Sequence, residues 1–301
     1  MTLPPPRLHL PYAPGPFRMA MGLTAVPEAE WIEIDAGYPA QLALRRALLA
    51  ERRTEVLAAL PGSGAAAREL LACLAANLAA HHPERFRLAG GRVENRLAGE
   101  TWPLPRDATE AEEALATLGH LVQEDFCLLR PDAEGPRLIA AVLCFPSRWR
   151  LRDKLGAPLA AVHGPVPLYA ERLARPVDRF LAALAPGRLA LRFNWAVHDD
   201  PTLFQPGGGG DTLCAVTPRD AGDRLFLRVE RQTFRLLPES RAVAFGIRTH
   251  VAPLAAVAAE PGEAARLAAA VRALPPEMRR YKGLHRFEPA LLAWLDARAA
   301  G

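Results

Sequence analysis

Five short segments in the middle of the chain have the composition of β-strands, and they constrain the fold more than any other feature. They are rich in β-branched and aromatic residues and are bounded by Pro, Gly or Asp. The segments are 125–131, 136–147, 189–200, 223–238 and 241–254. In the fourth, Leu227 and Val229 lie on one face of the expected strand, and Arg228 and Glu230 lie on the other. We therefore expect a central, largely antiparallel sheet of about five strands.

Segments with helical periodicity lie on both sides of these strands. Apolar residues recur three and four positions apart, with Arg and Glu between them. The expected helices are 38–60, 64–82, 107–122, 170–184, 262–274 and 288–300. Asp107 or Thr109 is the expected N-cap of the third helix. The fold class is α+β, a central antiparallel sheet flanked by N- and C-terminal helices.

Residues 1–35 have a different composition from the rest of the chain, because prolines recur through much of the segment. Such a segment is extended, and we expect it to pack as a lead on the body of the protein. Residues 36–301 are expected to form that body as a single domain. The Gly207–Gly210 run is expected to be a loop, since no strand-to-helix context makes it a phosphate site.

Composition argues against several classes of protein. Half of the 301 residues are hydrophobic and 23% are charged, which is typical of a soluble globular chain. The net charge is +4 and the arginines alternate with acids, so no nucleic-acid partner is expected. The four cysteines are widely separated, which fits reduced thiols in a cytosol. We find no signal peptide and no apolar run of membrane-spanning length, so we expect a cytoplasmic protein without a membrane partner.

Three of the eight histidines fall within or at the ends of the strand-rich region. His163 precedes a turn held stiff by Pro165 and Pro167, so it could ligate iron or donate a proton. A core histidine bonded to a turn carbonyl explains the same residues equally well. His198 is expected at an exposed strand end and His250 at a sheet edge. The other five histidines are expected to be structural or exposed.

No motif of a common enzyme class is present: there is no HExxH, GxSxG or P-loop, and no GxGxxG follows a strand. A single axial histidine is enough for heme, because the porphyrin supplies four ligands. Heme also needs arginines for its propionates and apolar walls. The residues that could supply these are Arg148, Arg231, Arg248, Trp149, Trp195, Phe193 and Phe245.

Two adjacent acids, Glu124 and Asp125, stand where the helix over 107–122 gives way to the first strand. Acids at a helix C-terminus oppose the helix dipole. This cost is expected to be offset by a partner arginine, although a functional role is the alternative.

Several longer blocks occur in the chain in one order. They are PYAPGPFRMAMGL at 11–23, VQEDF at 122–126, FPSRWRLRDKLGAPLAAVHGPVP at 145–167, LRVERQTFRLLPESRAVAFGIRTH at 227–250 and MRRYKGL at 278–284. Together they resemble the family of the heme-dependent oxidative N-demethylase α subunit, from about residue 10 to residue 295. The HGPVP and VERQTFRLLP blocks are the most specific.

The resemblance implies a PAS-like fold that holds heme b against its sheet. It also implies oxidation of a small secondary amine such as dimethylamine, with dioxygen as co-substrate and release of formaldehyde. This chain has no flavin, NAD or iron–sulfur motif, so electrons would come from a partner reductase that carries flavin and an iron–sulfur cluster. A tetrahydrofolate-dependent partner could accept the formaldehyde.

The resemblance also implies roles for individual residues. His163 in the HGPVP block is the first choice for the axial iron ligand, followed by His198 and His250. Candidates for binding the heme propionates, or for the heme pocket, are Arg231, Gln232, Arg248 and Trp195.

A pocket carboxylate or an aromatic face should receive an ammonium substrate. Glu124, Asp125 and Trp149 are the candidates for that role. Two alternative interpretations remain at this point. One is a non-catalytic heme-binding sensor or gas-binding protein, and the other is an α+β protein that binds no heme.

Overall fold

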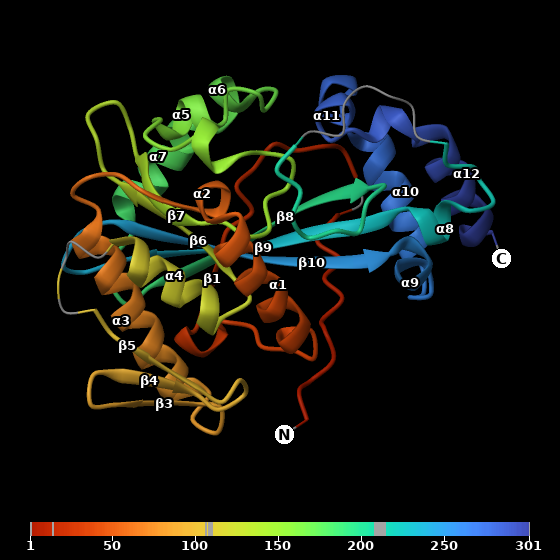
Figure 1. Ribbon diagram of the computed structural model, residues 1–301. Coiled ribbons are helices and arrows are strands. Elements are labelled where there is room, and N and C mark those ends of the chain that lie inside the picture. The colour runs from red at the N-terminus through yellow and green to blue at the C-terminus, as the bar shows by residue number, and fades with distance from the viewer. Residues whose placement is uncertain (1, 14, 106, 108–110, 208–214, 301) are drawn as a thin grey trace.

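The computed structural model describes residues 2–13, 15–105, 107, 111–207 and 215–300 (Figure 1). Its main sheet has the strand order β1-β8-β9-β10-β6-β7-β2, and every neighbouring pair is antiparallel. Five of these strands confirm the expected segments: β6 (Asp125–Arg130), β7 (Arg137–Val142), β8 (Leu189–His198), β9 (Phe226–Leu236) and β10 (Val243–Pro253). Two short strands extend the sheet at its edges, β1 (Thr24–Val26) and β2 (Leu57–Ala59).

Helices cover both faces of this sheet and one end of it (Figure 1). One face packs on α1 (Tyr38–Glu51), α2 (Arg53–Val56), α3 (Gly64–His81) and α4 (Ala111–Leu121). The opposite face packs on a segment that connects β7 to β8. That segment contains η2 (Leu151–Asp153), α5 (Leu159–Val162), α6 (Tyr169–Arg172) and α7 (Ala174–Ala183). We call this segment the insertion.

The C-terminal helices form a third apolar cluster at the end of β8, β9 and β10 (Figure 1). They are α8 (Ala221–Arg224), α9 (Leu254–Ala258), α10 (Glu263–Ala273), α11 (Pro276–Tyr281), η3 (Leu284–Arg286) and α12 (Glu288–Ala299). Tyr12 of the N-terminal segment is buried in this cluster. The early residues therefore contact an element more than 200 residues later in the chain.

The strand register assigns side chains to the two faces. Asn194 pairs with Glu230, and Glu230 with Thr249, so these residues share one face. Glu230 lies on the same face as Phe234, which packs with the insertion, so this is the insertion face. Residues one position away point to the other side, which we call the lead face. Phe193, Arg231, Arg248 and His250 lie there.

Three expectations about local structure need correction. The expected helix over 38–60 ends at Glu51, and residues 57–59 instead pair with β7 as an edge strand. The helix over 170–184 is divided at Leu173 into α6 and α7. A separate sheet of three strands, β3 (Phe86–Ala89), β4 (Arg92–Asn95) and β5 (Glu100–Pro103), was not expected at all. In each case tertiary pairing or packing overrides a helical or unpatterned sequence.

Other expectations are confirmed or lie outside the described residues. The helices expected at 64–82, 262–274 and 288–300 are α3, α10 and α12. Cys73, Cys127 and Cys144 are free thiols. Cys214, Thr109 and most of the expected glycine loop lie outside the described residues. Within the described part of the chain, no helix is both long and apolar enough to cross a membrane.

Candidate functional site

His163 lies at the C-terminal end of α5, on the insertion. Its Nδ1 is 2.9 Å from the carbonyl oxygen of Leu159, and its ring stacks on Tyr169 with centroids 4.5 Å apart. A carbonyl can only accept a hydrogen bond, so Nδ1 carries the proton and the neutral ring has an unprotonated Nε2. Burial lowers the pKa of His163, and the nearby cations Lys154 and Arg192 lower it further. His163 is therefore a neutral imidazole with a nitrogen available for a metal.

The insertion face of the sheet is partly open at its centre. Arg192, Asn194, Gln232, Phe234 and Phe245 lie on this face and are only half-buried. Gln232, Phe234 and Phe245 lie on strands that are hydrogen-bonded on both sides, so their exposure arises above the sheet. Arg192 and Asn194 lie on β8 beyond its short pairing with β1, where β8 is the edge of the sheet. We call these five residues, together with the buried Glu230 on the same face, the open patch.

A buried carboxylate lies within the open patch. Glu230 is 9% exposed, and its Oε2 accepts hydrogen bonds from Gln232 at 2.8 Å and from Asn194 at 3.4 Å. The Lys282 ammonium is near it and donates to the carbonyl oxygen of Trp195 at 2.5 Å. Burial lowers the pKa of Lys282 to about 8, although Glu230 opposes this effect. The patch thus combines one anion with at least one strongly desolvated cation.

Arg192 adds a second cation beside Glu230. Its Nε is buried and has no hydrogen-bond partner among the described residues. Burial lowers the pKa of Arg192, and Glu230 counteracts this. An unmet buried donor costs free energy, about 1–3 kcal/mol. An anionic ligand on the patch would satisfy this donor.

Aromatic rings form walls around the open patch. Phe234 stacks on Phe245 with centroids 4.8 Å apart and meets Phe180 edge-on at 5.5 Å. Trp149 packs in the same apolar cluster, and Lys154 Nζ lies 4.4 Å from its ring centroid. The surroundings therefore fit heme. They offer a neutral imidazole, flat apolar walls and basic groups for propionates.

The two arginines expected near heme lie on the other face. Arg248 pairs with Asp35 at 2.6 Å and donates to Gln41 at 2.7 Å. Arg231 pairs with Glu33 at 3.4 Å and donates to the carbonyl oxygen of Trp31 at 3.3 Å. The structure therefore does not bring Arg231 or Arg248 to the same face as His163.

The other two expected heme contacts, Gln232 and Trp195, lie on opposite faces of the sheet. Gln232 belongs to the open patch. Trp195 lies on the lead face, edge-on to Tyr12 with centroids 5.6 Å apart. Of the four expected heme contacts near β8–β10, only Gln232 is thus on the face that carries the open patch.

Asp125 has the arginine partner that its sequence position suggested. Its Oδ1 is 2.6 Å from Arg45 Nη1, and both side chains are completely buried. The same carboxylate accepts the backbone N–H groups of Cys144 at 2.7 Å and Phe145 at 2.8 Å. Asp125 therefore joins α1 to the ends of β6 and β7, and it is not part of the open patch.

Glu124 is also buried and away from the open patch. Its Oε1 accepts the backbone N–H of Glu33 at 2.9 Å, while its Oε2 has no partner among the described residues. Burial raises the pKa of Glu124 from 4.5 to about 7, although Arg248 acts in the opposite direction.

Glu124 gives a testable pH dependence of stability. Between pH 4.5 and about 7 the folded protein holds a proton that the unfolded chain releases, so the free energy of unfolding falls as pH rises. The fall is at most about 3 kcal/mol. In Glu124→Gln this part of the pH dependence should disappear, whereas Glu84→Gln, at an exposed site, should retain it. Urea unfolding between pH 4 and pH 8 measures the difference, and identical pH profiles for Glu124→Gln and the natural chain would contradict this account.

His198 does not have the exposed position that was expected. His198 is 3% exposed, and its Nδ1 is 2.9 Å from Gln205 Oε1. Burial, with Arg148 and Arg228 nearby, lowers its pKa to about 3. His250 lies on β10 beyond the pairing with β6, which ends at Ile247, so only β9 is hydrogen-bonded beside it. Its Nε2 is 3.0 Å from Glu33.

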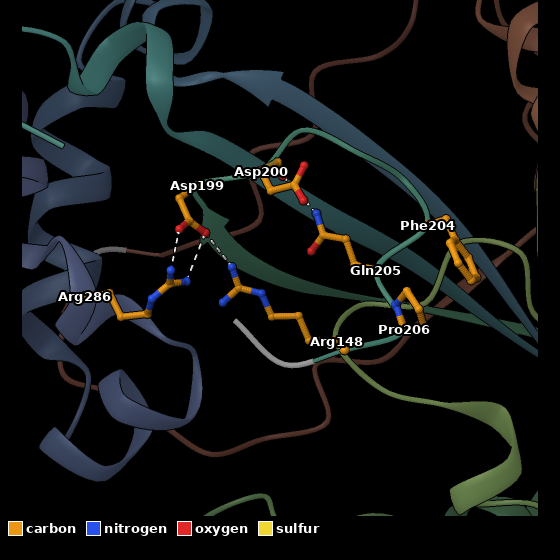
Figure 2. Close-up of a pocket in the computed structure, with 8 residues that line it drawn as sticks. Arg148, Asp199, Asp200, Phe204, Gln205, Pro206 and Arg286 are labelled. Atoms are coloured by element: carbon orange, nitrogen blue, oxygen red, sulfur yellow. Dashed lines mark hydrogen bonds and ion pairs between the residues drawn. The ribbon is translucent and has the colours of Figure 1, made fainter. Parts of the chain in front are cut away.

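A polar pocket of about 350 Å³ lies beside Gln205 (Figure 2). Within it Asp199 pairs with both Arg148 and Arg286, each at 2.8 Å. Because these charged side chains are already paired with one another, the pocket has fewer groups free to bind heme propionates than the open patch has.

The sequence pattern did not single out Arg192, Glu230 or Lys282. Arg192 and Glu230 stand in alternating strands where any polar residue would suit an exposed face. Of the three, only Lys282 could have been singled out from the sequence, because it is one of only two lysines and lies within the MRRYKGL block.

A comparison with protein families finds one family model that matches most of the chain. The family model described as "Haem-dependent oxidative N-demethylase, alpha subunit-like" matches residues 22–292. The match includes the whole insertion, both faces of the sheet and nearly all of the C-terminal helices. The chain therefore belongs to the heme-dependent oxidative N-demethylase α subunit-like family.

Proposed function

We propose that this chain binds heme b on the open patch, with His163 as the axial ligand, and acts as the α subunit of an oxidative N-demethylase. The observation that carries the proposal is the state of His163. Its Nδ1 is held by the Leu159 carbonyl, which leaves Nε2 unprotonated beside a half-open, aromatic-lined sheet face. The hydrogen bond also fixes the ring orientation and increases the basicity of Nε2.

The topology supports a PAS-like core within residues 36–301. Strands β6 to β10 are arranged in the order β8-β9-β10-β6-β7, and the helical insertion stands between the second and third of them along the chain. In such a core the cofactor lies between the insertion and the sheet. Residues 1–35 are then a lead that packs on this core.

Arg192 and Lys282 are the proposed partners of the heme propionates. Both are desolvated cations beside the open patch, and Arg192 has an unmet donor. Trp149 and Phe245 would form apolar walls, and Gln232 a polar contact. When bound, heme supplies the chemistry that activates dioxygen, while the protein holds the ligand, positions the amine and limits access of water.

Glu230 is the proposed binding group for the amine, a small secondary amine such as dimethylamine. The amine arrives as an ammonium ion, and Glu230 is a carboxylate on the open patch whose orientation is held by Gln232 and Asn194. The carboxylate can also accept the ammonium proton, so that the nitrogen is neutral before its methyl group is oxidised. We prefer Glu230 to the three residues suggested by the sequence as the amine-binding group. Glu124 and Asp125 lie away from the open patch, and the Lys154 ammonium already covers one face of the Trp149 ring.

Glu230→Gln should weaken amine binding without removing heme. Loss of a charge-assisted hydrogen bond corresponds to about 1.5–3 kcal/mol, or roughly 10- to 150-fold in Kd. The measurement is a titration of the heme-loaded protein with dimethylammonium, followed through the Soret band. Glu171→Gln, on the exposed side of α6, is the matched control and should bind as the natural chain does. An unchanged Kd in Glu230→Gln would remove Glu230 from the amine site.

Electrons would come from a partner reductase with flavin and an iron–sulfur cluster, and the α subunit-like family name supports a multi-subunit assembly. A tetrahydrofolate-dependent partner would accept the formaldehyde, and the site of action would be the cytoplasm. Formaldehyde release from dimethylamine, with such a reductase supplying electrons, tests the activity. Stoichiometric heme binding with no formaldehyde from any small amine would instead favour a heme-binding sensor.

A further inference from the structure

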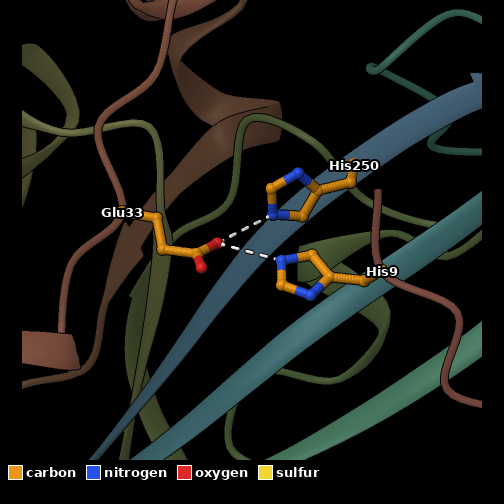
Figure 3. Close-up of side chains that lie close together, drawn as sticks. All are labelled: His9, Glu33 and His250. Atoms are coloured by element: carbon orange, nitrogen blue, oxygen red, sulfur yellow. Dashed lines mark hydrogen bonds and ion pairs between the residues drawn. The ribbon is translucent and has the colours of Figure 1, made fainter. Parts of the chain in front are cut away.

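Three side chains from distant parts of the chain meet on the lead face of the sheet (Figure 3). His9 belongs to the N-terminal segment, Glu33 precedes α1, and His250 lies on β10. Glu33 Oε2 is 3.4 Å from His9 Nε2 and 3.0 Å from His250 Nε2. The two imidazole rings lie edge to face with centroids 4.7 Å apart. We call these residues the His9 cluster.

The spacing of these atoms matches a set of metal ligands. The three ligand atoms lie within 4.8 Å of one another. For bonds of about 2.1 Å in a tetrahedral site, neighbouring ligand atoms are roughly 3.4 Å apart. Two imidazoles and one carboxylate suit divalent transition metals such as Zn²⁺ and Fe²⁺. The geometry needs only small adjustments to receive an ion.

We propose that His9, Glu33 and His250 bind one divalent transition-metal ion on the lead face, opposite the heme side of the sheet. The ion would take Glu33 Oε2 and the Nε2 atoms of both histidines. The other carboxylate oxygen, Oε1, pairs with Arg231 at 3.4 Å. Such an outer partner orients a ligating carboxylate.

The His9 cluster borders a cavity through which an ion could enter. The cavity has a volume of about 250 Å³, and Glu33 and His250 line it. His82 lines it as well, and its Nε2 is buried without a hydrogen-bond partner among the described residues. The three ligand side chains themselves retain only 9–15% exposure. The site is therefore largely desolvated but connected to open space.

The metal would hold the N-terminal segment on the sheet. His9 contributes one ligand from that segment, and its ring also packs against Phe193 of β8 with centroids 5.0 Å apart. The ion would link His9 to Glu33, 24 positions later in the sequence, and to His250, 241 positions later. The ion would thus act as a clip, and its loss would expose the first residues of the chain to proteases.

The test uses the untagged full chain, stripped with a chelator and titrated with Zn²⁺ and with Co²⁺. Bound Co²⁺ is followed by its visible absorption, and the metal present after purification by elemental analysis, with heme iron counted separately. We expect one ion per chain and slower cleavage of the N-terminal segment by trypsin when metal is present. His9→Ala and His250→Ala should each weaken binding at least tenfold.

His81→Ala is the matched control, because His81 is an exposed histidine at the end of α3. It should bind metal as the natural chain does. His9→Ala is the decisive variant, since it changes only the N-terminal segment, and circular dichroism will show whether the fold is intact. Binding below one ion per chain, or binding that is unchanged in folded His9→Ala, would overturn the proposal and leave a hydrogen-bonded cluster without metal. Neither result depends on heme binding.

Discussion

Replacing His163 with alanine is expected to abolish stable heme binding while leaving the fold intact. The ring is half-buried at the end of a one-turn helix, so its loss should change the free energy of unfolding by only about 1 kcal/mol. The affinity for heme should fall by more than the roughly 10- to 100-fold that follows loss of a residue that only supports a ligand. The measurement is the Soret band of ferric and dithionite-reduced protein at equal chain concentration.

Controls for this variant separate ligation from structure. His163→Gly with added imidazole should recover the Soret band, because free imidazole can occupy the space of the lost ring. His250→Ala should retain heme, since His250 lies on the lead face. If His163→Ala keeps the natural spectrum while His198→Ala or His250→Ala loses it, the assignment of His163 is wrong.

Asp125→Asn is expected to cause the largest loss of stability of any single change considered. Asp125 and Arg45 are both fully buried, and the carboxylate also accepts two backbone N–H groups. Removing its charge leaves the Arg45 guanidinium buried without a counter-charge, which costs about 3–5 kcal/mol. That is a large share of the roughly 5–15 kcal/mol that stabilises a typical domain.

The matched control for this prediction is Asp132→Asn. Asp132 also pairs with an arginine, Arg137 at 3.1 Å, but both side chains are partly exposed. Its loss should therefore cost far less stability than the loss of Asp125, because solvent screens an exposed pair. Urea unfolding at pH 7, with all proteins free of heme, compares the two. Similar losses for Asp125→Asn and Asp132→Asn would show that the buried pair has no special role in stability.

Much of the fold could be predicted because the strands carry their own pattern. Alternation in 223–238 and the bounding Pro, Gly and Asp residues located β9 and its neighbours. The edge strand over 57–59 could not be predicted, because its residues continue a helical pattern and become a strand only through pairing with β7. The small sheet over 86–103 likewise depends on pairing rather than on alternation.

The candidate site was only partly predictable for a related reason. His163 was noticeable because prolines fix the turn that follows it. Arg231 and Gln232 are adjacent in one motif, yet strand geometry sends them to opposite faces. The His9 cluster was missed entirely, since Glu33 is 24 residues from His9 and 217 from His250. Such contacts depend on the order of the strands and on the path of the N-terminal segment. Neither can be predicted from a local sequence pattern.

A titration of the heme-free, purified chain with hemin shows most directly whether the open patch binds heme. We expect a Soret band that saturates at one heme per chain, with spectra of a histidine-ligated heme in the ferric and reduced states. An absence of saturable binding, in protein shown to be folded by circular dichroism, would contradict the heme site on the open patch and with it the proposed demethylase activity.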